Sequence, residues 1–175
     1  MVNNQIEFNE KYNNNKEVEE IEIKRNRNFQ GELVIEDYSE LKKLYLRNIR
    51  SIEKITLKNL PQLQECTIWD CGVKELVISN CPNIETLNVR SNSLTSLEFL
   101  VNLRKLTELE IEGNPELIEI LKPYKGDWRN WKGSQTNPKG SSYNIQSSKK
   151  VESEASLKKE SKLETKIEIP LKSGN

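Results

Sequence analysis

Apolar residues recur along this chain in a short pattern that repeats every 21 to 23 residues. In each copy the first, fourth and sixth positions are apolar, and a side chain with a polar group stands between the fourth and the sixth. Alternation with a period of two is typical of a β-strand with one buried face. The pattern therefore predicts five strands, whose buried sets are Val18/Ile21/Ile23, Leu41/Leu44/Leu46, Leu63/Cys66/Ile68, Ile84/Leu87/Val89 and Leu106/Leu109/Ile111.

A second apolar pattern lies about half a repeat away from the first. The segments GELVIED, EKITLKN and KELVISN, around Leu33, Ile55 and Leu76, are rich in β-branched residues and also alternate with a period of two. They predict short strands on the opposite side of each repeat. The fourth repeat differs, because SLTSLEFLVNLRKL places apolar residues every three positions and so predicts a 3₁₀ or short α-helical back.

The five copies fit the template L-x-x-L-x-L-x-x-N, with Asn26, Ile49, Cys71, Asn92 and Asn114 at the ninth position. In this the chain resembles the leucine-rich-repeat proteins. The resemblance implies an α/β-type solenoid, a short right-handed coil of about five turns with a parallel concave sheet and a convex side of short strands or 3₁₀ turns.

The ninth position is expected to hold each turn together. An Asn there can bond buried backbone groups, which cost about 1–3 kcal/mol each when they are left unpaired. Cys is the accepted substitute for Asn in the family that the chain resembles. Ile49 has no polar atom in its side chain, so the second turn is expected to be locally irregular or to be satisfied in another way.

A solenoid of repeats needs covered ends. Ile6, Phe8 and Tyr12 predict a helical cap before the first repeat, and the aromatic residues Trp128 and Trp131 are interpreted as part of a cap after the last one rather than as ligand-binding groups. The predicted organisation is an N-terminal cap (1–17), leucine-rich repeats (18–121), a C-terminal cap (122–132) and a polar tail (133–175). The tail, dominated by Ser, Lys, Glu, Asn and Pro, is expected to be disordered.

Composition narrows the classes of function. Lys plus Arg and Asp plus Glu number 27 each, so the formal net charge is zero, which argues against general attraction to nucleic acid or membranes. No apolar run approaches the roughly 18 residues of a transmembrane helix, and the N-terminus lacks the apolar core of a signal peptide. The odd number of cysteines, 3, does not suggest a disulfide framework. These features predict a reduced, cytoplasmic compartment.

The chemistry of the chain does not suggest an enzyme. It contains no histidine, which removes the usual general base, the usual partner of a nucleophile and the commonest metal ligand. Cys66, Cys71 and Cys81 form no C-x-x-C pair and fall on core positions of the repeats, so we interpret them as structural rather than zinc-binding. Glycine-rich phosphate-binding motifs are absent from the sequence. We expect no catalysis, no metal and no cofactor.

The exposed positions of the predicted sheet supply the candidate site. There Trp69 is expected to lie between Arg47 and Arg90, with Tyr45 and Asn88 alongside. Trp, Tyr and Arg are the residue types enriched at binding hot spots, which predicts that these five residues contact a partner. The competing interpretation is an Arg–Trp–Arg stack that satisfies itself by cation–π contacts.

The leading functional prediction is therefore a protein–protein interaction scaffold, which binds another protein through the concave leucine-rich-repeat face. The alternative is a binder of a phosphorylated, acidic or nucleic-acid ligand through Arg47, Trp69, Arg90 and the tail. From residue 133 onward the tail carries 8 Lys against 5 Glu. Zero net charge weighs against the nucleic-acid version. The sequence leaves open which protein is bound and whether the concave face or the tail binds it.

Overall fold

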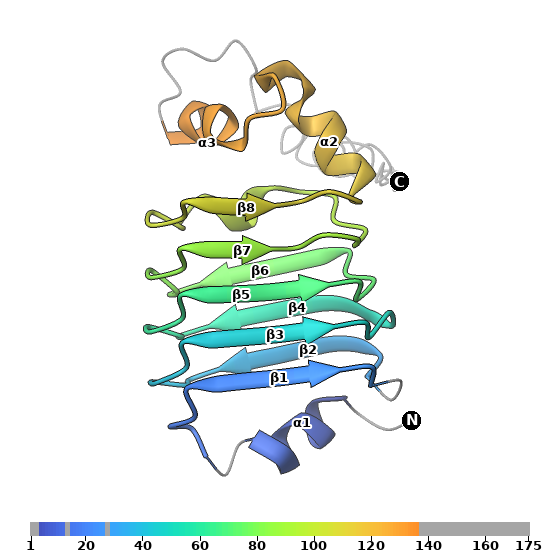
Figure 1. Cartoon of the computed structure of the whole chain (residues 1–175), viewed down its shortest axis with the longest axis vertical. Helices are drawn as coiled ribbons and strands as arrows, with labels where there is room; N and C mark the ends of the chain where they lie inside the picture. The colour runs from blue at the N-terminus through green and yellow to red at the C-terminus, as the bar shows by residue number, and fades with distance from the viewer. Residues whose placement is uncertain (1–3, 13–14, 27–28, 137–175) are drawn as a thin grey trace, which may run out of the picture. The chain divides into compact units, whose positions relative to one another are not determined.

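The computed structural model of the chain describes residues 4–12, 15–26 and 29–136. These residues form a β-solenoid of about four turns, in which parallel strands stack along the axis of the coil (Figure 1). The tail that was expected to be disordered begins at residue 133, but residues 133–136 are the last residues of a helix, so for them the expectation is wrong. From residue 137 onward the tail lies outside the described residues, and there the expectation stays a prediction.

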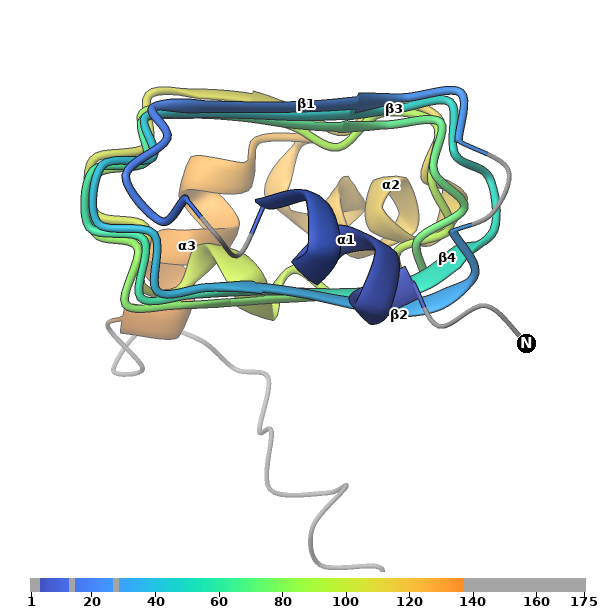
Figure 2. The same cartoon turned by 90° about the horizontal axis from the view of Figure 1, so that it is seen from below.

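Two parallel sheets form the long walls of the coil, which has a flattened, roughly rectangular cross-section (Figure 2). The first sheet has the strand order β1-β3-β5-β7-β8 and the second the order β2-β4-β6. The strands of the first sheet are β1 (Glu20–Lys24), β3 (Lys43–Arg47), β5 (Glu65–Trp69), β7 (Thr86–Asn88) and β8 (Glu108–Glu110). Those of the second are β2 (Gly31–Glu36), β4 (Ile52–Lys58) and β6 (Glu75–Ser79).

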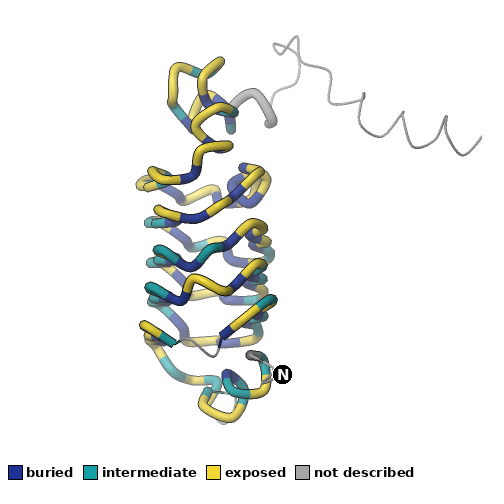
Figure 3. The backbone as a smooth tube through the Cα atoms, turned by 90° about the vertical axis from the view of Figure 1, so that its right-hand side faces the viewer, coloured by how far each residue is buried: buried dark blue, intermediate teal, exposed yellow. Residues whose placement is uncertain are grey.

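The repeated pattern of the sequence becomes the register of the first sheet. Successive fourth positions pair across the strands, as Ile21 with Leu44, Leu44 with Cys66, Cys66 with Leu87 and Leu87 with Leu109. Side chains at the first four of these positions are buried, whereas Leu109 in the last strand is half-buried. Buried positions alternate with more exposed ones along the strands, because successive side chains point to opposite faces of the sheet. Figure 3 shows that the turns of the coil contain both buried and exposed residues.

The fourth repeat lacks a strand in the second sheet, as its spacing predicts. Its back is the 3₁₀ helix η1 (Glu98–Leu100), which buries Phe99 and Leu100 against the core. The second sheet consequently ends at β6.

The buried asparagines at the ninth position hold the turns. The side-chain oxygen of Asn92 accepts bonds from the amides of Cys71 and Val73 at 3.1 and 3.2 Å, and its side-chain nitrogen donates to the carbonyl of Ile68 at 2.6 Å. Asn114 likewise accepts from the amide of Leu94 and donates to the carbonyls of Val89 and Ile111.

The turn around Ile49 differs from those held by asparagine. The side chain of Ile49 is buried, both of its neighbours, Asn48 and Arg50, have a φ of 57°, and the amide of Ser51 donates to the Ile49 carbonyl at 2.8 Å. Left-handed residues flank Cys71 in the same way, since Asp70 has a φ of 53° and Gly72 a φ of 80°. The Ile49 turn therefore follows the backbone of the next repeat, without a polar side chain at its ninth position. The thiol of Cys71, which stands one repeat later, donates to the carbonyl of Leu46 at 3.3 Å.

Two features of the predicted fold need correction. The structure has about four turns rather than five, because β8 of the fifth copy leads into helices and not into a returning back segment. The α/β description is also not supported, since the α-helices in the described part of the chain lie at the ends of the coil and not in its repeats.

The helix α1 (Asn4–Tyr12) lies across the N-terminal opening of the coil (Figure 2). Phe8 is buried there, and the side-chain amide of Gln5 pairs with both the amide and the carbonyl of Val34, at 2.8 and 2.9 Å, on the edge of β2. Ile6, which was predicted to belong to this cap, is instead 54% exposed. The opposite face of the helix supplies the apolar contact.

The C-terminal end is covered by α2 (Pro115–Leu121), the 3₁₀ helix η2 (Lys122–Tyr124) and α3 (Trp128–Thr136). Leu117, Leu121, Trp128 and Trp131 are buried there, as the cap interpretation of the tryptophans requires. The helical region begins at Pro115, within the range 18–121 that was predicted to be repeats.

Candidate partner-binding face

The exposed side of the five-stranded sheet brings together the backbones of the predicted site residues. Trp69 ends β5 and stands in register with Arg47 at the end of β3. On the other side, the amide of Asp70 donates to the carbonyl of Arg90 at 3.2 Å, so Arg90 follows on the neighbouring strand. The Trp69 side chain is 41% exposed, which is unusual for an indole and gives this face an apolar centre.

Arg47 contacts Tyr45 and not Trp69. Its guanidinium lies 4.7 Å from the centroid of the Tyr45 ring, and one of its nitrogens is 3.8 Å from a carboxylate oxygen of Glu22. Tyr45 is two residues before Arg47 on the same strand, so both side chains lie on the same face of the sheet.

Arg90 is held by two carboxylates on the last strand and its extension. Its guanidinium nitrogens lie 3.2 Å from Glu110 and 3.4 Å from Glu112. Asn88 also donates to Glu110, at 2.5 Å, and its side-chain oxygen accepts from the amide of Arg90. Among the residues that the structure describes, no cation lies over the Trp69 ring. The Arg–Trp–Arg stack is therefore wrong, because both arginines turn toward carboxylates on the outer strands.

Tyr45 also makes a short polar contact on this face. Its hydroxyl donates to Glu65 at 2.6 Å, and Lys43 lies 3.1 Å from the other oxygen of that carboxylate. The hydrogen bond to Glu65 is the main reason that the pKa of Tyr45 is raised to about 12. The same bond, with that from Lys43, lowers the pKa of Glu65.

Glu65 and Glu22 are parts of the face that the candidate list did not include. A signal for Glu65 was present, since Lys43 and Glu65 stand at the same position of successive repeats and are in register. The pairing of Arg47 with Glu22 was not readable, because it depends on which rotamer the long arginine side chain adopts.

The assembled face has an exposed indole surrounded by ion pairs and hydrogen-bonded polar groups. Exposed ion pairs of this kind contribute little to stability, typically about 0–1 kcal/mol. They can therefore exchange partners with another protein, while the indole supplies an apolar contact.

The cysteines are part of the core. Cys66, Cys71 and Cys81 are free and buried, and burial raises the pKa of each thiol, that of Cys71 to about 12. Within the described residues, no group of three or more His, Cys, Asp or Glu side chains is placed to hold a metal ion. In the same part of the chain, none of the helices has the length and apolar character needed to cross a membrane.

Comparisons with known proteins add no relative to this picture. No family model matches the sequence, and neither a curated protein nor a solved structure gives a match.

Proposed function

We propose that this chain is a leucine-rich-repeat-like scaffold that binds another protein through the exposed face of its five-stranded sheet. The observation that carries the proposal is the 41% exposed Trp69 at the centre of that face, within a ring of polar and charged side chains. An apolar aromatic centre with a polar rim is the usual anatomy of a protein interface. Arg47, Tyr45, Asn88 and Arg90 would form the part of the rim nearest to it.

The assignment to leucine-rich repeats is supported by the nine-residue template and by asparagines that bond neighbouring turns at Asn92 and Asn114. The resemblance counts the fifth copy of the template as a turn of the coil, and this copy contributes the strand β8. Three free, buried thiols support a reducing compartment, and we extend the proposal to a cytoplasmic location.

The ion pairs disfavour the alternative of a phosphorylated, acidic or nucleic-acid ligand on this face. Glu22, Glu110 and Glu112 neutralise Arg47 and Arg90, and the carboxylates would repel an anionic ligand. A protein partner with an apolar group for Trp69 avoids that cost.

Affinity capture with the intact chain and an Arg47→Glu/Trp69→Ala variant tests the proposal. The matched control is Lys74→Glu/Val77→Ala, which changes one exposed cation just before β6 and one exposed apolar residue within that strand. The expected result is a partner captured by the intact chain and the control and lost by the first variant, with circular dichroism showing that all three fold. Capture of the same set by all three contradicts the proposal.

A further inference from the structure

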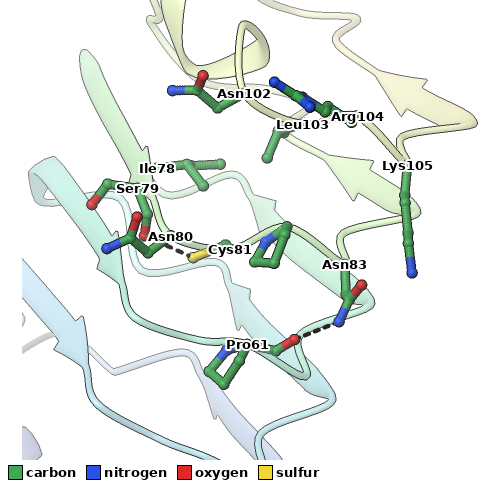
Figure 4. Close-up of a pocket in the computed structure, with 11 residues that line it drawn as sticks. Pro61, Ile78, Ser79, Asn80, Cys81, Asn83, Asn102, Leu103, Arg104 and Lys105 are labelled. Atoms are coloured by element: carbon green, nitrogen blue, oxygen red, sulfur yellow. Dashed lines mark hydrogen bonds between the residues drawn. The ribbon is translucent and has the colours of Figure 1, made fainter.

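A groove of about 780 Å³ opens at the corner of the solenoid that follows the second sheet (Figure 4). Its residues come from three successive turns, which begin at Asn59, Asn80 and Asn102. Apolar groups of Pro61, Pro82 and Leu103 line it together with polar side chains. This volume is in the range of sites that bind ligands in other proteins.

The first two turns at this corner are joined by a ladder of side-chain amides. Asn80 donates to Asn59 at 2.9 Å, and Asn59 donates to Asp37 at 2.8 Å. All three residues have φ between 53° and 62°, so the same left-handed turn recurs in each repeat. Asn83 adds a second link, because its amide donates to the carbonyl of Pro61 at 2.6 Å. These bonds fix the spacing of the first two turns.

The ladder stops one step short of the last turn. Asn102 follows Asn80 by 22 residues and so occupies the next position, but among the described residues no hydrogen bond joins the two side chains. The physical reason lies in the second sheet, which ends at β6 because η1 replaces the next strand. The amide oxygen of Asn80 and the side chain of Asn102 are consequently left with free hydrogen-bonding capacity at the walls of the groove.

The charge of the groove has one sign. Arg104 and Lys105 line it and are exposed, and within the described part of the chain neither side chain takes part in an ion pair or a hydrogen bond. No Asp or Glu is among the lining residues. This contrasts with the sheets, where lysines such as Lys54 and Lys58 pair with glutamates of the neighbouring strand. Two adjacent unpaired cations favour a ligand that carries carboxylates.

We propose that this groove binds a short, extended acidic peptide segment of a partner protein. Peptide N–H groups supply the donor that the Asn80 oxygen lacks, and peptide carbonyls supply the acceptor for the Asn102 amide. Carboxylates of the peptide meet Arg104 and Lys105, while alternate apolar side chains cover Pro61, Pro82 and Leu103. A sulfate or carboxylate ion has no donor for Asn80, and the groove lies apart from the Trp69 face, which belongs to the other sheet.

The test uses the full chain, labelled with ¹⁵N, and the peptide Gly-Glu-Val-Glu-Val-Glu-Gly. Titration is expected to shift the side-chain amide signals of Asn80 and Asn102. Arg104→Glu/Lys105→Glu is expected to weaken binding at least about tenfold, since it opposes like charges. The matched control, Lys58→Glu/Lys74→Glu, makes the same change in net charge on the second sheet and should bind within about twofold of the unchanged chain.

A second variant separates a loss of peptide binding from a loss of the fold. Asn102→Ala removes an exposed side chain without a hydrogen-bond partner in the described structure and is expected to weaken binding by a few fold while leaving the fold intact. Circular dichroism of every variant checks the fold.

Four results would each overturn the proposal. The first is equal binding of the peptide with Gln in place of Glu, and the second is equal loss in the Lys58/Lys74 control. The third is the same amide shifts produced by inorganic phosphate at the same concentration, which would make the groove an anion site. The fourth is shifts that appear on concentrating the protein without peptide, which would make a second copy of the chain the occupant.

Discussion

At the scale of single residues, the fold depends on a few polar side chains placed inside an apolar core. Asn92 is only 6% exposed and bonds five backbone groups from three segments of the coil. These groups stand where each strand ends and the chain turns, so no strand partner is available to them. One buried amide therefore stabilises two neighbouring turns together.

Replacing Asn92 with Ala is expected to lower the free energy of unfolding by about 2–4 kcal/mol, because it leaves buried backbone amides and carbonyls unpaired. Urea unfolding measures the change. Asn130→Ala is the matched control, since the Asn130 side chain is exposed and its bond to Tyr124 is long, at 3.5 Å. The control should change stability by less than about 0.5 kcal/mol. Equal effects of the two substitutions would show that the buried amide does not hold the turns.

The contact between Tyr45 and Glu65 predicts a dependence on pH. The pKa of Tyr45 is raised from its ordinary value of 10.0 to about 12, so the contact stabilises the fold below pH 10 and this contribution is lost as the pH rises through about 12. Glu65→Gln is expected to move the phenolate titration of Tyr45 back toward its ordinary pKa. Alkaline titration of the phenolate absorbance, with Tyr45→Phe to identify the signal, measures the shift.

The control for this titration is the pair Tyr45→Phe and Tyr45→Phe/Glu65→Gln, whose curves should coincide. If Glu65→Gln leaves the titration of Tyr45 unchanged in the chain that keeps this tyrosine, the hydrogen bond is not the cause of the raised pKa.

At the scale of elements, the turns set how closely the strands can stack. Gly72 has a φ of +80°, and a Cβ at this position would lie 2.7 Å from the carbonyl oxygen of Arg50 in the preceding turn. Gly126 has a similar φ of +74°, but a Cβ there would have no heavy atom within 4 Å. The two glycines share a backbone conformation and differ in how near the next turn lies.

This difference predicts unequal effects of two otherwise similar substitutions. Gly126→Ala costs the conformational strain of an L residue in the left-handed region, about 1 kcal/mol. Gly72→Ala adds the clash with the Arg50 carbonyl and is expected to cost about 1–3 kcal/mol more. Thermal and urea unfolding of both variants measure the difference. Equal destabilisation would mean that the turns can move apart without loss, contrary to the packing described.

At the scale of the whole molecule, the repeated pattern made most of the fold predictable. Buried positions such as Leu44, Cys66 and Leu87 could be predicted from their spacing alone. The same spacing recurs in every repeat, so a wrong assignment in one copy would put it out of register with its neighbours. The strands of the second sheet and the 3₁₀ back of the fourth repeat followed from local periods. The number of turns could not be predicted in this way, because the last strand leads into helices and not into another repeat.

The candidate site was less predictable than the fold. Register placed the backbones of Arg47, Trp69 and Arg90 side by side, but it did not show that both arginine side chains turn toward carboxylates on the outer strands. The groove beside Asn102 could not be predicted either. It arises where the 3₁₀ helix η1 follows β6 in place of a further strand of the second sheet. This change is visible only when successive repeats are compared.

The most direct test of the central claim, that the five-stranded sheet binds a partner protein, is site-specific photocrosslinking from position 69. Trp69 is replaced by a benzophenone amino acid of similar size, and Val77, which is 36% exposed on the second sheet, is replaced in a matched control. The account predicts a discrete adduct from position 69 and none from position 77. Adducts from both positions, or only from position 77, would contradict it.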